Sequence, residues 1–328
     1  MAESEGRPVG AARVTRAARA TASRPVDGVL LVDKPAGPSS NAVLGHVRRL
    51  YSAAKAGHTG TLDPLASGLL PVCFGAATRY SGMLLDAPKR YLATVRFGIA
   101  TTTGDAEGEV TAAHPVAFDE AQLRAALDRA VGPQLQIPPR HSALKFAGRP
   151  HYEYARAGID VPRTPREITI YSLQLVEWKA PDATIAIECS KGTYVRALAA
   201  SLGDELGCGA HLASLRRTGS GGFDVKDAVT VEAIEALDVE GRERLLRPAS
   251  VLVAHLPRVV LDHATARSFR HGQPIACPGA TVVSRHALRA VFEGVALIGT
   301  GEIRGGLLHP GRLTPEAASS TDAEAFRD

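Results

Sequence analysis

Cysteine is scarce in this sequence, and its few residues form no pattern. The chain of 328 residues contains four cysteines that stand apart without a CxxC pair: Cys73, Cys189, Cys208 and Cys277. Zinc sites and disulfide frameworks need clustered or regularly spaced cysteines. The sequence therefore predicts reduced thiols, no metal site and no disulfide scaffold.

Long hydrophobic runs are also missing. No stretch approaches the roughly 18 consecutive apolar residues of a membrane-spanning helix, and the N-terminal residues lack the apolar segment of a secretory signal. Hydrophobic residues nevertheless make up 45% of the chain, which is enough for one large domain and a small one. We therefore expect a soluble, cytoplasmic protein with no membrane partner.

The charge and the two ends of the chain carry little information about function. A net charge of +4 suits a polyanionic partner but is common among proteins that never bind nucleic acid. Residues 1–25 contain no aromatic residue, and we predict that they form a disordered basic arm, with contacts to RNA that are weak at most. Glu3 and Glu5 disfavour the alternative of an organelle transit peptide. Residues 315–328 are predicted to be a flexible tail.

Residues 26–250 alternate between strand and helix signals. Residues 29–32 form an apolar run that ends at Pro35, which predicts a buried strand, and Ser39 or Ser40 is placed to cap the helix that follows. Asp119 and Gln122 form a capping box for a second helix that Gly132 ends. Three further runs resemble strands, at residues 91–98, 168–170 and 184–187. The mixture predicts an α/β (α+β) sheet domain.

After about residue 250 the sequence pattern changes to short β-prone runs separated by glycine and proline. These runs lie at residues 259–261, 281–283 and 295–299. We expect residues 251–314 to form a small C-terminal β-barrel.

The most informative segment, residues 57–71, reads GHTGTLDPLASGLLP and encloses Asp63 between glycines and a proline. Because Pro64 biases the preceding residue away from the helical region, Asp63 is expected to sit in an extended, rigid loop. Taken alone, the pattern is more typical of a turn aspartate that hydrogen-bonds to its own backbone.

This segment resembles the signature of the TruB family of pseudouridine synthases, whose bacterial members modify position 55 in the T-loop of tRNA. Further similar segments follow in the same order: GVLLVDKPAGPSS from Gly28, KRY from Lys89, QIPPRHSALKFAGRPHYEYARAG from Gln136, CSKGTYVRALAASLGDELG from Cys189, and LRRTGSGGF. The resemblance covers about residues 26–312, and several motifs in one order are far more specific than a single short one.

The resemblance implies an isomerase that needs no cofactor, with Asp63 as the nucleophile. The reaction cleaves the bond between uracil N1 and ribose C1', turns the base, and joins its C5 to C1', so that no oxidation occurs. Whether the carboxylate attacks the sugar or acts at the base is left open by the sequence. The family fold adds a mixed, largely antiparallel sheet in the catalytic domain.

Arg196 is the residue that we expect to pair with Asp63, because a nearby cation favours an ionised carboxylate. A helix capped by Thr193 would place Arg196 beside the small residues Ala199 and Gly203, on a face that permits close approach. Without the resemblance, a solvated surface arginine would be the simpler interpretation.

Four further residues receive roles from the resemblance. Tyr91 would be catalytic, stacking on the extruded uracil, and Leu215 would pack against it, although both residue types are common in protein cores. Tyr194 and His58 would also contact the substrate, His58 without acid–base chemistry. For Lys34 we expect a structural role in support of the loop.

The implied partner is tRNA, with no obligatory protein partner. Basic and aromatic residues alternate in the section from Arg140 to Arg166, as recognition of loop RNA requires. The C-terminal barrel resembles a PUA domain, which implies a contact with the acceptor end of tRNA. Two alternatives remain: a guide-dependent synthase within an RNA–protein particle, and a non-catalytic tRNA-binding folding factor.

Overall fold

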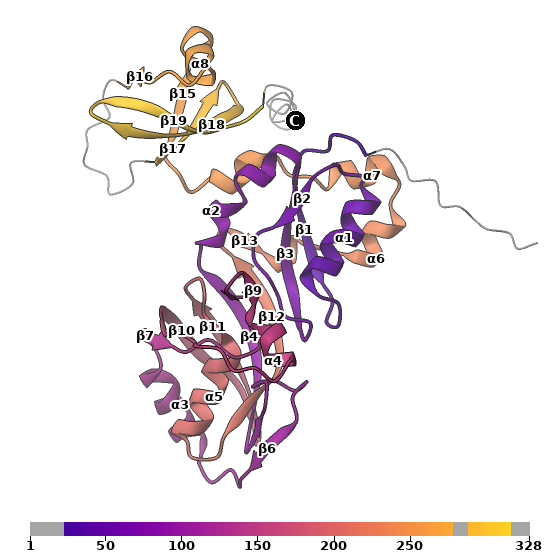
Figure 1. The fold of residues 1–328 in the computed structure, drawn as a ribbon, viewed down its shortest axis with the longest axis vertical. Coiled ribbons are helices and arrows are strands. Elements are labelled where there is room, and N and C mark those ends of the chain that lie inside the picture. The colour runs from indigo at the N-terminus through magenta and orange to yellow at the C-terminus, as the bar shows by residue number, and fades with distance from the viewer. Residues whose placement is uncertain (1–22, 278–287, 316–328) are drawn as a thin grey trace, which may run out of the picture.

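The computed structural model describes residues 23–277 and 288–315, which form two sheets in an elongated molecule (Figure 1). The larger sheet has ten strands, and a five-stranded sheet follows it in sequence and lies at one end of the molecule. Three predicted features lie outside the described residues: the strand at 281–283, nearly all of the N-terminal arm and most of the C-terminal tail.

The ten-stranded sheet is mixed and mainly antiparallel, as expected. Its order is β14-β1-β3-β12-β4-β11-β10-β7, with β2 paired to β3 and β13 paired to β12, and only β1–β14 and β3–β12 are parallel pairs. Its strands are β1 (Gly28–Lys34), β2 (Ala56–His58), β3 (Ala66–Phe74), β4 (Lys89–Phe97), β7 (Gly132–Gln136), β10 (Arg166–Lys179), β11 (Asp182–Cys189), β12 (Ala210–Ser220), β13 (Phe223–Asp224) and β14 (Val229–Thr230).

Shorter elements surround this sheet. Two small hairpins pair β5 (Ile99–Thr101) with β6 (Val110–Ala113) and β8 (Lys145–Phe146) with β9 (Arg149–Pro150). The helices are α1 (Ser40–Leu50), α2 (Ser81–Leu85), α3 (Glu120–Arg129), α4 (His151–Arg156), α5 (Val195–Glu205), α6 (Val231–Ala236) and α7 (Val239–Arg244), with 3-10 turns at Gly75–Arg79, Val225–Asp227 and Ala249–Val253.

Local sequence signals account for several of these elements. Residues 29–32 are fully buried in β1, which has neighbours on both sides, and Ser39 caps α1 through its side chain. The capping box of Asp119 and Gln122 begins α3 as predicted. That helix ends at Arg129, however, and Gly132, with φ of 114°, opens β7 instead of ending the helix.

The predicted cap of α5 is wrong. Tyr194 occupies the N-cap position and makes no side-chain capping bond. The hydroxyl of Thr193 instead donates to the carbonyl of Ser190, 3.0 Å away, which closes the preceding turn. The beginning of α5 therefore depends on partners from elsewhere in the chain.

The five-stranded sheet, with order β15-β17-β18-β19-β16, forms a half-barrel consistent with the expected PUA-like domain. It contains β15 (Arg258–Leu261), β16 (Ile275–Ala276), β17 (Leu288–Glu293), β18 (Ala296–Arg304) and β19 (Leu307–Leu313), and α8 (His263–Arg270) packs on it. Phe292 and Leu297 pack in one buried cluster with Leu84 of α2, and the Tyr80 hydroxyl bonds to that of Thr314 at 2.6 Å. The two sheets thus share a core.

The N-terminal arm was expected to be disordered through residue 25, but Arg24 is ordered. Its backbone pairs with Ser52 and Ala54, and its guanidinium donates to the carbonyl of Tyr51 and pairs with Glu243. These bonds attach the described start of the chain to the end of α1. The domain limits at residues 26, 250 and 314 otherwise remain predictions.

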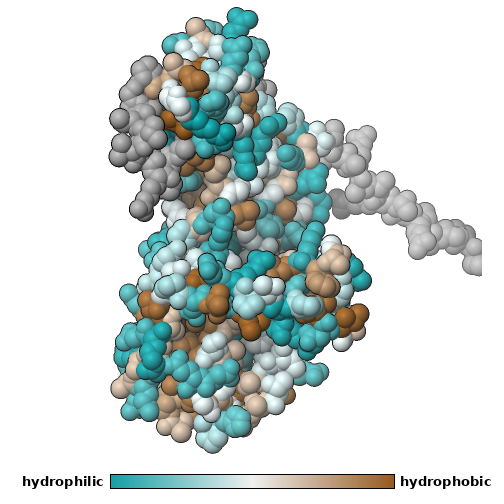
Figure 2. Space-filling view, turned by 60° about the vertical axis from the view of Figure 1, so that its left-hand side comes forward, coloured by the Kyte–Doolittle hydropathy of each residue, from teal (hydrophilic) through white to brown (hydrophobic). Residues whose placement is uncertain are grey.

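No helix among the described residues is long and apolar enough to cross a membrane. On the face that Figure 2 shows, apolar residues are scattered among hydrophilic ones. Apolar side chains scattered singly over a surface need no special explanation.

The contact between α5 and β12 depends on a glycine. A Cβ atom at Gly203 would lie 2.2 Å from the backbone nitrogen of Ala210, so Gly203→Ala must force the helix away from the sheet. We expect this substitution to lower the free energy of unfolding by about 1–3 kcal/mol or more. Gly45→Ala in α1, where the nearest atom to the new Cβ is 3.7 Å away, should raise it by about 0.5–1 kcal/mol. Urea unfolding of both variants tests this, and an equal effect at the two positions would contradict it.

Candidate active site

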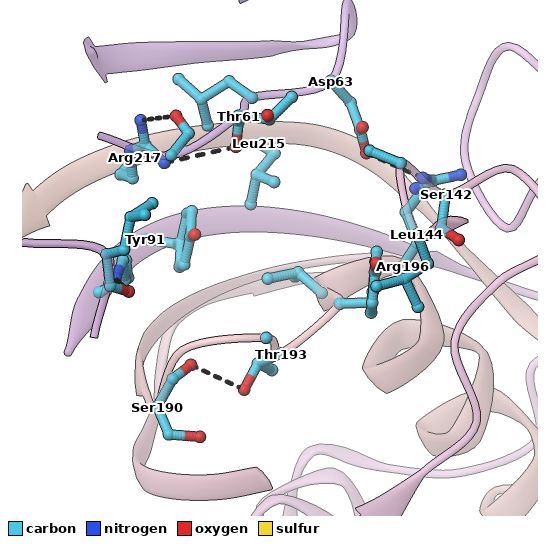
Figure 3. A pocket seen from close by; sticks show the side chains of 18 residues that line it. Thr61, Asp63, Tyr91, Ser142, Leu144, Ser190, Thr193, Arg196, Leu215 and Arg217 are labelled. Carbon is cyan, nitrogen blue, oxygen red and sulfur yellow. Dashed lines mark hydrogen bonds and ion pairs between the residues drawn. The ribbon is translucent and has the colours of Figure 1, made fainter. Parts of the chain in front are cut away.

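A cavity of about 420 Å³ opens between the ten-stranded sheet and the N-terminal end of α5. Five of the six predicted site residues line it: Asp63, Tyr91, Tyr194, Arg196 and Leu215. Its other walls come from residues 60–62, 142–144, 190, 192, 193 and 195 and from Leu85, Lys89 and Arg217. In Figure 3, Asp63 and Arg196 lie toward one end of the cavity, and Tyr91 and Arg217 lie toward the other.

Asp63 and Arg196 form the expected ion pair. Arg196 Nη2 lies 2.9 Å from Asp63 Oδ2, although the two residues are far apart in sequence. The Arg196 side chain is 6% exposed, whereas that of Asp63 is 42% exposed. The arginine is therefore not a surface residue. The pair therefore combines an accessible carboxylate, which faces the cavity, with a buried cation.

Arg196 has three more partners, which the sequence did not reveal. Its Nη1 lies 3.4 Å from Asp105 Oδ2, and its guanidinium donates to the carbonyls of Thr103 and His141 at 3.2 and 2.8 Å. Asp105 is itself buried, and its carboxylate accepts hydrogen bonds from the Thr103 hydroxyl and the Glu107 amide. One guanidinium thus joins the loops around residues 63, 105 and 141.

The loop that carries Asp63 is fastened mainly through its backbone. The hydroxyl of Ser40 both accepts from the Leu62 amide and donates to the Leu62 carbonyl, at 2.7 and 2.9 Å. Arg217, almost fully buried, donates to the carbonyl oxygens of Leu69 and Gly60 at 2.7 and 3.1 Å. These bonds hold the loop without using the carboxylate of Asp63, which lines the cavity and pairs with Arg196.

Lys34 has the structural position that we predicted. Its ammonium group donates to the carbonyls of Pro35 and Pro38, and the Gly37 amide donates to the carbonyl of Pro64. The segment after β1 is thereby attached to the Asp63 loop. Burial lowers the pKa of Lys34 to about 8.

Tyr91 and Leu215 face the cavity from neighbouring strands. Tyr91 pairs in register with Arg217, and Leu215 pairs with Ala93. Burial raises the pKa of Tyr91, and the adjacent guanidinium of Arg217 opposes that rise. The structure therefore offers a neutral phenol ring and an aliphatic side chain on one wall, an arrangement that suits a planar base.

His58 and Tyr194 differ in how closely they meet expectation. Tyr194 lines the cavity at the start of α5, and burial raises the pKa of its hydroxyl. His58 lies on β2 outside the cavity lining, with Nε2 3.3 Å from Asn41 Oδ1 and with Nδ1 accepting from the Gly60 amide. Burial, followed by the charge of Arg217, lowers the pKa of His58. A contact between His58 and the substrate remains a prediction.

The cavity is bordered by cations. Lys89, whose pKa burial lowers to about 8, lines it together with Arg196 and Arg217, and Asp63 is the carboxylate among the lining residues. The ammonium of Lys89 donates to three carbonyls at the end of α2. Among the described residues, no group of three His, Cys, Asp or Glu side chains is placed to hold a metal ion. The site suits a substrate with negative charge next to a neutral ring.

Family models account for nearly all of the described chain. Residues 48–195 match the N-terminal domain of TruB family pseudouridylate synthase. Residues 196–256 match the C-terminal domain of tRNA pseudouridylate synthase B, and residues 257–314 match the C-terminal model of pseudouridine synthase II TruB. The chain belongs to the TruB family.

Relatives and solved structures agree with this family. A tRNA pseudouridine synthase B of Chromobacterium violaceum is 50% identical over 90% of this chain and 97% of its own length. One of Burkholderia mallei is 51% identical over 90% of this chain and its whole length. The chain is also similar to a protein in the crystal structure of a Cbf5–Nop10–Gar1 complex, with a TM-score of 0.69 and 26% identity over 89% of this chain and 86% of that one.

The ion network around Arg196 makes a double-substitution test possible. Arg196→Met leaves Asp105 buried without a counter-charge, so we expect it to lower the free energy of unfolding by about 3–5 kcal/mol. Adding Asp105→Asn removes that charge and should recover part of the loss. Chemical unfolding of the wild type, both single variants and the double variant measures the coupling. Purely additive effects would show that the two side chains do not stabilise one another.

Proposed function

We propose that this protein is a stand-alone tRNA pseudouridine synthase that isomerises the T-loop uridine at position 55. Membership of the TruB family supports the reaction class. The observation that carries the proposal is the accessible carboxylate of Asp63, held by the buried guanidinium of Arg196 in a cavity that also contains Tyr91. In this proposal these three residues are catalytic.

The geometry suits the chemistry of a base that is detached and rejoined. Arg196 Nη2 lies 2.9 Å from the Asp63 carboxylate, which would act as a nucleophile at the sugar, the route that we favour, or at the base. The bond from C1' to N1 breaks, the bond from C1' to C5 forms, and the proton lost from C5 is balanced by one gained at N1. Tyr91 would stack on the uracil, Leu215 would contact it from the same wall, and Tyr194 would contact it from the start of α5.

A section near the cavity supplies groups suited to holding the RNA. The guanidinium of Arg149 lies 5.1 Å from the ring centre of Tyr154, and that of Arg156 lies 5.4 Å from the ring centre of Tyr152. These cation–π pairs present positive charge and ring faces together, which is the combination that phosphates and unstacked bases require. Residues 142–144 of the same section line the cavity.

The degree of similarity favours a stand-alone enzyme over the guide-dependent alternative. The relatives named tRNA pseudouridine synthase B are about 50% identical over nearly their whole lengths, whereas the protein of the Cbf5–Nop10–Gar1 complex is 26% identical. The presence of Asp63, Tyr91 and Arg196 in one cavity also disfavours a purely non-catalytic tRNA-binding factor. A tRNA substrate is consistent with the cytoplasmic location that the sequence predicts.

Asp63→Asn keeps the shape of the side chain but removes its charge, so we expect turnover to vanish. Affinity for tRNA should stay within about twofold of the wild type, because phosphate contacts elsewhere supply most of it. Asp128→Asn, on the exposed side of α3, is the matched control and should be fully active. Pseudouridine mapping in unmodified tRNA, without guide RNA, measures the outcome. Near-normal turnover of Asp63→Asn would show that the nucleophile is another residue.

Base extraction should also determine which RNAs react. A T-loop already presents unpaired uridines, so a minimal T-arm hairpin should be a substrate. Placing the same uridine in continuous duplex adds an unpairing and unstacking cost of a few kcal/mol, which slows the reaction by roughly two orders of magnitude or more. Single-turnover rates on the two RNAs test this expectation. Equal rates would contradict base extraction as a source of selectivity.

The half-barrel would contact the acceptor end of tRNA. Because it shares a buried cluster with α2, removing it would expose core residues, and the contact is better examined with the intact protein. Full-length tRNA should bind more tightly than the T-arm hairpin and with a steeper dependence on salt. Equal affinities and salt slopes would leave the half-barrel without this role.

A further inference from the structure

The helix that carries Arg196 begins without a cap of its own, and a distant side chain takes over that function. The N-cap residue of α5, Tyr194, makes no side-chain capping bond. Its backbone amide instead donates to Oε1 of Gln136 at 2.7 Å, and Nε2 of Gln136 donates back to the Tyr194 carbonyl at 3.1 Å. The side-chain amide of Gln136 therefore bonds to both polar backbone atoms of Tyr194, the residue at which the helix starts.

Gln136 is well anchored for this task. It is the last residue of β7, it pairs in register with Arg166 of β10, and it is only 9% exposed. The two residues before it, Gln134 and Leu135, are less buried. A buried amide at the end of the strand thus supplies a partner to the Tyr194 amide, one of the N-terminal amides of a helix that have no acceptor within it. It also adds a second donor to the Tyr194 carbonyl, which already accepts from the Leu198 amide.

Both segments that meet at this contact, α5 and the segment after β7, lead to Arg196. Along α5, Arg196 follows Tyr194 within the first turn, so the position of the Tyr194 peptide sets where its guanidinium begins. On the β7 side of the contact, the segment that follows Gln136 carries the His141 carbonyl, which accepts from Arg196 Nη2 at 2.8 Å. The same segment continues into the cavity-lining residues 142–144. Gln136 is thus the point where two walls of the cavity are joined.

We propose that Gln136 is a positioning residue for catalysis: its amide sets the start of α5 so that Arg196 meets Asp63. This inference rests on the proposed pseudouridine synthase activity. Gln136 does not line the cavity, and its effect passes through Tyr194 and Arg196. We call the two hydrogen bonds between Gln136 and the Tyr194 backbone the clamp. Loss of the clamp should reduce the rate of the chemical step more than it reduces RNA binding.

The clamp needs one donor and one acceptor on the same planar group, which suggests a specific set of variants. Leucine at this position supplies neither. A glutamate carboxylate supplies the acceptor for the Tyr194 amide but repels the Tyr194 carbonyl, whereas a protonated glutamic acid supplies an O–H donor and a C=O acceptor in nearly the shape of the amide. Gln136→Glu should therefore regain the clamp when it takes up a proton.

The rate test compares Gln136→Leu with Gln134→Leu. Gln134 lies on the same strand but donates to the Ala130 carbonyl, away from α5, and its variant should react as fast as the wild type. For Gln136→Leu we expect the single-turnover rate on tRNA to fall about tenfold or more, with the dissociation constant changed less than about twofold. A rate within twofold of the wild type, or an equal loss in rate and in binding, would overturn the proposal.

The pH dependence of Gln136→Glu provides a test within one folded protein. At pH 8 we expect this variant to be as slow as Gln136→Leu, and its rate relative to the wild type should rise at least about threefold as the pH falls to about 5.5. Dividing by the wild-type rate removes the pH dependence that the two proteins share. The charged groups that act on Tyr194, namely Arg166, Asp63 and Arg196, are the same in both proteins.

A ratio for Gln136→Glu that does not change with pH would contradict the clamp. A constant ratio for Gln136→Leu is expected, because leucine does not titrate. If the wild type and Gln134→Leu form no pseudouridine, the proposed function itself fails. That result is distinct from an active wild type whose Gln136 variants are equally active.

Discussion

A buried guanidinium imposes the constraint on which the site depends. Arg196 is almost inaccessible to water, and a charge in that position is tolerated only when nearly all of its donors are paired and its charge is balanced. The chain meets this requirement with Asp63, Asp105 and the carbonyls of Thr103 and His141. Loops that are distant in sequence must therefore assemble around one side chain, so that folding and construction of the site are a single event.

Much of the fold could be predicted because its signals are local. A serine before α1, a capping box before α3 and apolar runs in the strands need only a few neighbouring residues to act. The Asp63–Pro64 loop could be found for the same reason, and the family resemblance then supplied Arg196 as its partner. The prediction failed at Thr193, because its hydroxyl donates to the Ser190 carbonyl in the preceding turn and the N-cap position falls one residue later, at Tyr194.

The supporting residues could not be predicted, because their roles depend on long-range register. Asp105 lies in a glycine-flanked turn with no helical or strand periodicity, and only the packing of that turn against α5 makes it a partner of Arg196. Arg217 sits in a motif rich in arginine, but its burial follows from the parallel pairing of β12 with β3. There Gly68, with φ of 100°, admits the Arg217 backbone: a Cβ would lie 2.3 Å from its carbonyl oxygen.

The two carboxylates on Arg196 have unequal access to solvent, and this inequality bears on the covalent route. If Asp63 attacks the sugar, its carboxylate becomes a neutral ester and no longer balances the guanidinium. Asp105, which is buried and bonded from its own loop, still balances it. The buried cation is therefore paired both before and after the covalent bond forms. An arrangement with one carboxylate alone would leave an uncompensated charge in the intermediate, at a cost of several kcal/mol. On that route, the second carboxylate would remove an electrostatic penalty that Asp63 would otherwise meet as a nucleophile.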